Sequence, residues 1–422
     1  DNKFDQEFSS KSTILSIENT PYFPFGLTYM QHHLHGSDVV QNLGFNGQGK
    51  HIAILDAGFK KVDQTPALEH LFNENRILST YDFVRKESSV YEDHYHGEAV
   101  LSIIAGYDPE YYIGSATKAS FHLLISEDVF SETITEEYYW VVAAEYADSA
   151  GVDIINTSLG YTTFDDSTTN HSYSDMNGHT TIAARGLNIA ASKGVLCVTS
   201  AGNSGANSWK YISTPADADL GLTVGAVDSN GLRAPFSSQG PSFDGDIKPN
   251  VMSVGWNTYY IPPGSSFADQ GNGTSFSAPM MTGMVAALWE AMPELSNFEL
   301  IHLLEEYSHL YGQPDSLMGY GIPNIHQLLL DNSNYEELFS KTKILNVYPN
   351  PFTEELIVLY KSDSDKEIQI KMHSISGKIF HNRGLNVKKG INKLRIFQAN
   401  ELALGIYLIT VDNEVIKAIK SK

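Results

Sequence analysis

The chain of 422 residues has a single cysteine, Cys197, so no intrachain disulfide can form. Cys197 stands within the apolar run 194–200 and is expected to be a small core residue. No apolar run reaches the length of about 18 residues that a transmembrane helix needs. Lys and Arg number 28 against 50 Asp and Glu, and the resulting charge of −22 argues against nucleic-acid binding. Hydrophobic residues make up 42%, which indicates a globular chain without a membrane span.

The charge is unevenly distributed and indicates two domains. Residues 336–422 carry 14 basic and 10 acidic residues, a net charge of +4, which leaves −26 for residues 1–335. The change follows a polar stretch at 331–337 that resembles a linker after a helix at 325–330. We therefore predict a first domain over 1–335 with its core at about 40–330, a linker at 336–345 and a second domain over 346–422.

The second domain is predicted to be a small antiparallel β-sandwich. Apolar and polar residues alternate in four segments, and turn signals at 376–377, 389–390 and 412–413 separate them. The predicted strands are 355–360, 367–372, 393–397 and 405–411.

In the first domain, residues 271–280 place Ser275 after a glycine-rich turn and before an apolar run, 280–289, that predicts a buried helix. The N-terminus of a helix favours negative charge, which suits a nucleophile that forms an anionic intermediate. A serine at this position is equally a common helix N-cap.

Three further polar residues follow predicted elements of the same domain. Asp56 directly follows the apolar strand 51–55. It is therefore expected at the edge of a parallel sheet, where α/β proteins place catalytic residues. His96 begins a short apolar helix, and Asn203 follows the strand 194–200 with an amide that could donate to an oxyanion. Taken singly, Asp56 and Asn203 could each be an ordinary turn residue, and His96 is one of 15 histidines in the chain. None of the three alone indicates a catalytic site.

Together these segments resemble the subtilisin-like serine peptidases, the subtilases. The matching motifs are Leu-Asp-Ala-Gly at 55–58, His-Gly at 96–97, Ala-Gly-Asn-Ser-Gly at 201–205 and Gly-Thr-Ser-Phe-Ser-Ala-Pro at 273–279. They occur in the order of that family. The resemblance implies an α/β three-layer fold with a central parallel sheet. It also implies a secreted endopeptidase with the triad Asp56, His96 and Ser275, Asn203 in the oxyanion hole, and no cofactor for the chemistry.

The resemblance also implies where a peptide or protein substrate binds. One wall of the cleft is Ser158, Leu159 and Gly160, and the other is Thr199, Ser200, Ala201 and Gly202. The pocket floor is expected near residues 213–215. The loop 161–177 is rich in oxygen ligands and could bind a structural calcium ion, although such loops are usually solvated and this one could instead shape substrate access.

Glu98 departs from the family pattern, which usually has threonine after His-Gly. It could raise the pKa of His96 one turn away, or it could be an exposed first-turn residue that the helix dipole favours. A related family, the sedolisins, has Glu in place of the histidine and Asp in place of the asparagine. The presence of His96 and Asn203 argues against that family.

The C-terminal domain resembles the sorting domain of proteins exported by the bacterial type IX secretion system. The matching segments are 347–352, 375–378, 404–407 and the basic end at 416–420. The resemblance implies the secretion machinery as a partner, a secreted or cell-surface protein of a Bacteroidetes-type bacterium, and removal of the tail at or after export. The chain, which begins at Asp1, is then expected to be a trimmed form of a longer precursor. Two alternatives remain open: a carbohydrate- or surface-binding sandwich for the tail, and a catalytically silent binding protein for the whole chain.

Overall fold

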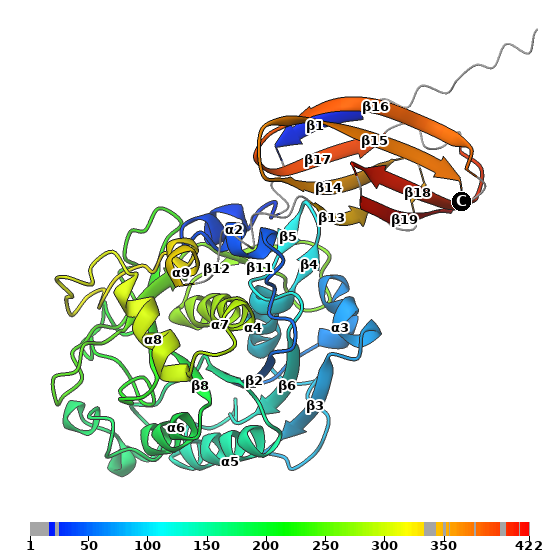
Figure 1. Cartoon of the computed structure of the whole chain (residues 1–422). Coiled ribbons are helices and arrows are strands. Elements are labelled where there is room, and N and C mark those ends of the chain that lie inside the picture. Colours follow the sequence, from blue (N-terminus) through cyan, green and yellow to red (C-terminus); the bar gives the residue numbers. More distant parts are fainter. Residues whose placement is uncertain are drawn as a thin grey trace, which may run out of the picture. The chain divides into compact units, whose positions relative to one another are not determined.

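The computed structural model describes residues 17–21, 25–332, 343–348, 352–353, 355–374, 377–396, 402–412 and 414–421. The chain forms two compact units, one of residues 24–333 and one of residues 334–422 together with the first 23 residues (Figure 1). Within the described ranges, no helix combines the length and the apolar character that crossing a membrane requires.

The larger unit is built on a parallel sheet of seven strands in the order β10-β9-β8-β7-β2-β6-β3. Each pair of neighbours is parallel. Most of these strands are apolar and buried throughout because helices cover both faces of the sheet. The strands are β2 (His51–Asp56), β3 (Ile77–Asp82), β6 (Ser120–Ile125), β7 (Ile154–Thr157), β8 (Leu196–Ser200), β9 (Leu222–Val227) and β10 (Val251–Val254).

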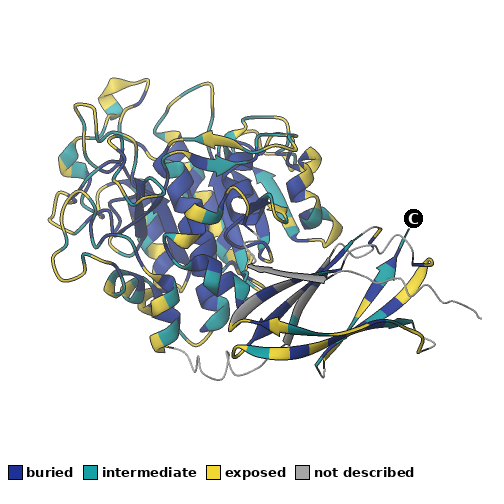
Figure 2. Ribbon diagram, turned by 90° about the horizontal axis from the view of Figure 1, so that it is seen from above, coloured by how far each residue is buried: buried dark blue, intermediate teal, exposed yellow. Residues whose placement is uncertain are grey.

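Helices α4 (His96–Ala105) and α7 (Thr274–Ala291) cover one face of this sheet, and α5 (Thr135–Ser149) and α6 (Ile182–Ser192) cover the other (Figure 1). Figure 2 shows that the buried residues concentrate in the sheet and in the helices next to it. This is the predicted three-layer fold, and Cys197 lies buried in β8 as expected.

Shorter elements surround these layers. They are α1 (Tyr29–His33), α2 (Ser37–Asn42), α3 (Glu69–Asn73), α8 (Asn297–Glu306), α9 (Ile325–Asn332), and the hairpins of β4 (Tyr107–Asp108) with β5 (Tyr112–Ile113) and of β11 (Thr258–Tyr260) with β12 (Asp269–Gly271).

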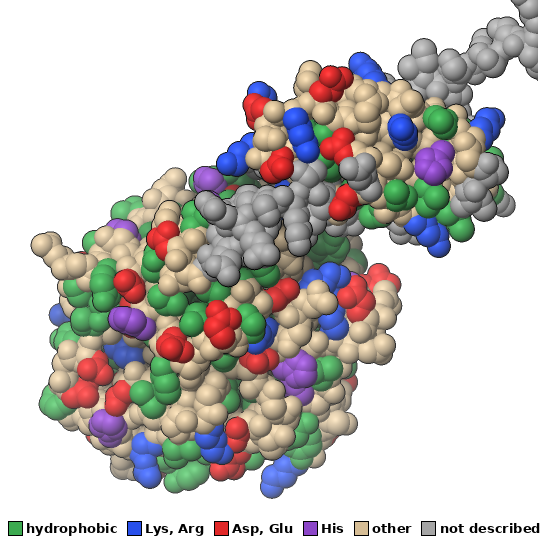
Figure 3. Space-filling model, viewed as in Figure 1, with side chains coloured by type: hydrophobic (Ala, Val, Ile, Leu, Met, Phe, Trp, Pro, Cys, Tyr) green, Lys and Arg blue, Asp and Glu red, His purple; other side chains and the backbone are tan. Residues whose placement is uncertain are grey.

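The smaller unit is an antiparallel β-sandwich of two four-stranded sheets, β1-β17-β14-β13 and β16-β15-β18-β19. Its core contains the aromatic side chains of Phe352, Tyr360 and Tyr407. On the face visible in Figure 3, Lys and Arg lie among acidic side chains. The strands are β1 (Ile17–Pro21), β13 (Lys343–Tyr348), β14 (Leu356–Ser362), β15 (Lys366–Ser374), β16 (Ile379–Val387), β17 (Gly390–Ile396), β18 (Gly405–Val411) and β19 (Glu414–Lys420).

The four predicted strands of the sandwich correspond to β14, β15, β17 and β18, with Phe397 outside the described residues. Strands β13, β16 and β19 were not predicted. The sequence-based division assigned residues 17–21 to the first domain, and this was wrong. These residues pair with β17 and belong to the sandwich, because an extended segment can pair with an open sheet edge far away in the sequence.

Candidate active site

The three residues of the predicted triad stand at the ends of elements in the larger unit. Asp56 is the last residue of β2, His96 the first of α4, and Ser275 the second of α7. The two helices lie on the same face of the sheet and contact each other. Gly97 allows the start of α4 to approach the end of β2, because a Cβ there would lie 2.6 Å from the Gly58 carbonyl oxygen and 3.0 Å from Asp56 Cβ.

Asp56 and His96 form a hydrogen-bonded pair. His96 Nδ1 lies 2.7 Å from Asp56 Oδ1, and the same oxygen accepts a hydrogen bond from the backbone N–H of Ala57 at 2.7 Å. The Asp56 side chain is fully buried, whereas that of His96 is 21% exposed. Burial acts to lower the pKa of His96, but the charge and the hydrogen bond of Asp56 outweigh it, so the pKa is raised above the ordinary 6.5.

Ser275 lies at the N-terminus of α7, the end of a helix that favours negative charge. The next residue, Phe276, stacks with the His96 ring at a centroid distance of 6.4 Å and an interplanar angle of 17°. In the described structure Ser275 Oγ makes no hydrogen bond to His96. Catalytic hydrogen bonds are often long before substrate binds, so this geometry is compatible with base catalysis.

Asn203 stands beside Ser275, and Thr274 orients it. Its Oδ1 accepts hydrogen bonds from Thr274 N–H at 2.9 Å and from Thr274 Oγ1 at 3.1 Å, which fixes the side-chain amide. A Cβ on Gly273 would lie 2.9 Å from Ser275 Oγ and 3.8 Å from Asn203 Nδ2. The nucleophile and the amide donor therefore converge on the space that Gly273 leaves open.

The two predicted substrate walls come from neighbouring strands. Thr157 and Thr199 are partners in the register of β7 and β8, so the segment 158–160, which follows β7, and the segment 199–202, which contains the end of β8, start side by side. Ser158 Oγ donates to the Ser275 carbonyl oxygen at 3.1 Å and accepts from Asn156 Nδ2 at 3.2 Å. These hydrogen bonds connect one wall to the N-terminus of α7.

Ser213 occupies the space between the two walls. A Cβ on Gly160 would lie 2.2 Å from Ser213 Oγ, and a Cβ on Gly202 would lie 3.1 Å from the same oxygen. The hydroxyl thus lies close to a glycine of each predicted wall. Ser213 is the first residue of the segment 213–215, where the pocket floor is predicted.

Glu98 is neither exposed nor a modifier of His96. Its side chain is fully buried, and its Oε1 accepts a hydrogen bond from Thr65 Oγ1 at 2.8 Å. Burial, only partly opposed by the Thr65 hydrogen bond, raises the pKa of this carboxyl to about 8. The expectation of an exposed first-turn residue is wrong, because α4 packs this position against the segment that contains Thr65. The raised pKa of His96 is due to Asp56.

The carboxylates of the loop 161–177 bind backbone N–H groups rather than converging on one point. Asp165 accepts from Glu132 N–H, Asp166 from Thr168 N–H and Asp175 from Ser172 N–H. A calcium ion in this loop stays a prediction that these contacts do not support.

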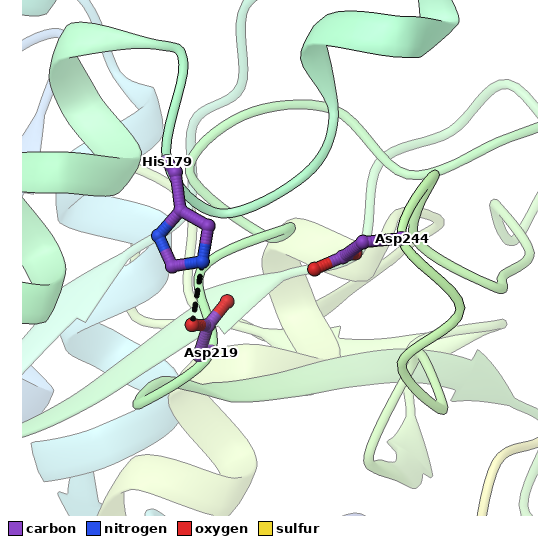
Figure 4. Close-up of side chains that lie close together, drawn as sticks. All are labelled: His179, Asp219 and Asp244. Carbon is purple, nitrogen blue, oxygen red and sulfur yellow. Dashed lines mark ion pairs between the residues drawn. The ribbon is translucent and has the colours of Figure 1, made fainter.

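A different group of residues could hold a cation. His179, Asp219 and Asp244 are exposed and each offer one ligand atom, and these atoms lie within 4.8 Å of one another (Figure 4). His179 Nε2 lies 3.3 Å from Asp219 Oδ2. A set with an imidazole suits a transition metal better than calcium, which takes oxygen ligands.

An acid, a base and a hydroxyl on strand and helix ends of a parallel sheet are the features of an α/β serine hydrolase. The family model described as the subtilase family matches residues 47–321, and the model described as the secretion system C-terminal sorting domain matches residues 346–422. The chain therefore belongs to the subtilase family. It is a serine endopeptidase with a type IX secretion sorting domain, which directs it to the cell surface or the extracellular space.

Individual relatives agree with this assignment. Subtilisin DY of Bacillus licheniformis is 29% identical over 276 residues, which cover 65% of this chain and 86% of the relative. Subtilisin Savinase of Lederbergia lenta is 28% identical over 302 residues, 71% of this chain and 96% of the relative. The crystal structure of MycP1 from Mycobacterium smegmatis has the same fold, with a TM-score of 0.56, 20% identity and coverage of 74% of this chain and 89% of that chain.

Proposed function

We propose that Asp56, His96 and Ser275 hydrolyse peptide bonds as a catalytic triad, with Asn203 as the side-chain donor of the oxyanion hole. The hydrogen bond of 2.7 Å between His96 and the buried Asp56 carries the proposal. It orients the imidazole and stabilises the imidazolium that forms during the reaction.

His96 Nε2 removes the proton of Ser275 Oγ while the oxygen attacks the carbonyl carbon of the substrate. Asn203 Nδ2 and the backbone N–H of Ser275 donate to the resulting oxyanion. The imidazolium then gives its proton to the leaving amine, and the acyl group remains on Ser275. Water, deprotonated by the same imidazole, releases the acid. Residues of the chain make every proton transfer, so the mechanism needs no cofactor.

The substrate chain lies extended between residues 158–160 and 199–202. Because Ser213 Oγ contacts Gly160 and Gly202, the pocket for the residue before the scissile bond accepts small side chains. The sandwich is the part of the chain that the type IX secretion machinery binds. A carbohydrate-binding role finds less support, because Phe352, Tyr360 and Tyr407 are buried instead of forming an exposed aromatic platform.

Labelling with a fluorophosphonate probe tests this function, with Ser275→Ala as the matched control and mass mapping of the modified peptide. The expected result is one label on Ser275 that is absent from the variant and decreases when a peptide substrate competes. A folded chain that takes no label would refute the triad and favour a silent binding protein.

A further inference from the structure

Strand β1 completes the sandwich from the opposite end of the chain. Ile17–Pro21 pairs antiparallel with β17, in a register that runs from Ile17 opposite Ile396 to Pro21 opposite Asn392. Without β1, β17 would be the edge of the sheet, with its backbone N–H and C=O groups unpaired on that side. A strand that fills such an edge is bound mainly through its backbone, as in β-augmentation.

The order along the chain gives this pairing an unusual consequence. β1 precedes the peptidase domain, whereas the other strands that the structure describes in the sandwich follow it. A cut in residues 333–342, between α9 and β13, therefore leaves β1 on the peptidase fragment and its partner β17 on the sorting fragment.

The register supports a specific pairing. Glu18 lies opposite Arg395 in the backbone register, and the pairing extends over all five residues of β1. On β17, the residues Asn392, Leu394 and Ile396 are buried, so every second position opposite β1 belongs to the core face of the sandwich. A shift by one residue would exchange the two faces of β1, which disfavours other registers.

We propose that β1 is a built-in docking strand, which keeps the sorting domain bound to the peptidase domain after the chain has been cut between them. Release of the sorting domain then requires two events: cleavage of the linker, and removal or undocking of the N-terminal strand. The binding partner of the β17 edge is thus an extended segment of the same chain.

The first test cuts the chain at a defined point. A recognition sequence for a specific protease is inserted after Glu337 in the full chain, in a Ser275→Ala background that prevents self-digestion. After cleavage, the two fragments are expected to co-elute in size-exclusion chromatography at the volume of the intact chain. A chain that lacks residues 1–16 keeps β1 and is expected to behave in the same way, whereas a chain that lacks residues 1–21 is expected to separate into two peaks.

Separation of the cut full-length chain would overturn the proposal, and so would co-elution of the fragments that lack residues 1–21.

A cross-link tests the register independently of these deletions. Facing residues of antiparallel strands are close enough for a disulfide, so Thr20→Cys with Lys393→Cys should link the two fragments under oxidation. Glu18→Cys with Lys393→Cys, two residues out of register, is the matched control and should link at least tenfold less. Equal linking of both pairs would refute the register.

Discussion

Replacing Glu98 by glutamine is expected to remove the contribution of this carboxyl to the pH dependence of stability between about pH 5 and about pH 7.5. The Glu98 carboxyl is fully buried, and its Oε2 has no hydrogen-bond partner in the described structure. Burial raises its pKa from the ordinary 4.5 to about 8. The folded protein therefore holds this carboxyl protonated at neutral pH, where the unfolded chain ionises it.

The direction of the pH dependence follows from the proton that the Glu98 carboxyl takes up on folding. The stability that this group contributes is fully present below pH 4.5 and is lost as the pH rises towards the folded pKa of about 8. At about 1.36 kcal/mol per pH unit, the contribution of Glu98 to the free energy of unfolding falls by about 3 kcal/mol between about pH 5 and about pH 7.5. Glutamine is neutral at every pH, so the variant should lack this loss while it keeps a hydrogen-bond acceptor for Thr65.

The assay is urea unfolding at several pH values, followed by tryptophan fluorescence in a Ser275→Ala background. The chain with the native glutamate is compared with the Glu98→Gln variant, with the exposed Glu294→Gln as the control. If the two curves of unfolding free energy against pH differ by a constant amount, the substitution has changed packing. If they differ in slope, the difference is due to the ionisation of the Glu98 carboxyl. Parallel curves for the native chain and the Glu98→Gln variant would show that Glu98 is not held protonated in the folded protein at neutral pH.

Three predictions concern turnover of peptide substrates. Asn203→Ala should lower kcat by about 10²–10³, a magnitude that comes from subtilisin itself, with little change in KM; a loss below tenfold would contradict the oxyanion role. In a pH profile, kcat/KM should rise with pH through a midpoint above 6.5, because His96 must be neutral and Asp56 raises its pKa; Glu98→Gln should leave this midpoint unchanged. Ser213→Gly should raise kcat/KM for phenylalanine relative to alanine before the scissile bond by about tenfold, given about 1–3 kcal/mol per accommodated methylene group; an unchanged ratio in a peptide-library screen would show that Ser213 does not limit the pocket.

Local patterns in the sequence predicted the layers of the larger unit well. Apolar runs of strand length, each followed by a polar turn, correspond to β2 and β8, and the helical run after Ser275 corresponds to α7. In the sandwich, alternation predicted β14, β15, β17 and β18. It missed β13, β16 and β19, whose apolar positions are interrupted by polar residues, as in the stretch from Ile379 to Val387.

The sequence by itself determined the family and the order of the four motifs, because these depend on residue identity and on neighbours along the chain. The tertiary structure alone decided which side chains meet. His96 is bonded to Asp56 across 40 residues, and Thr274 orients Asn203 across 71. The burial that keeps Glu98 neutral and the pairing of β1 with β17 likewise depend on packing and strand register between distant segments, for which no pattern of neighbouring residues is sufficient.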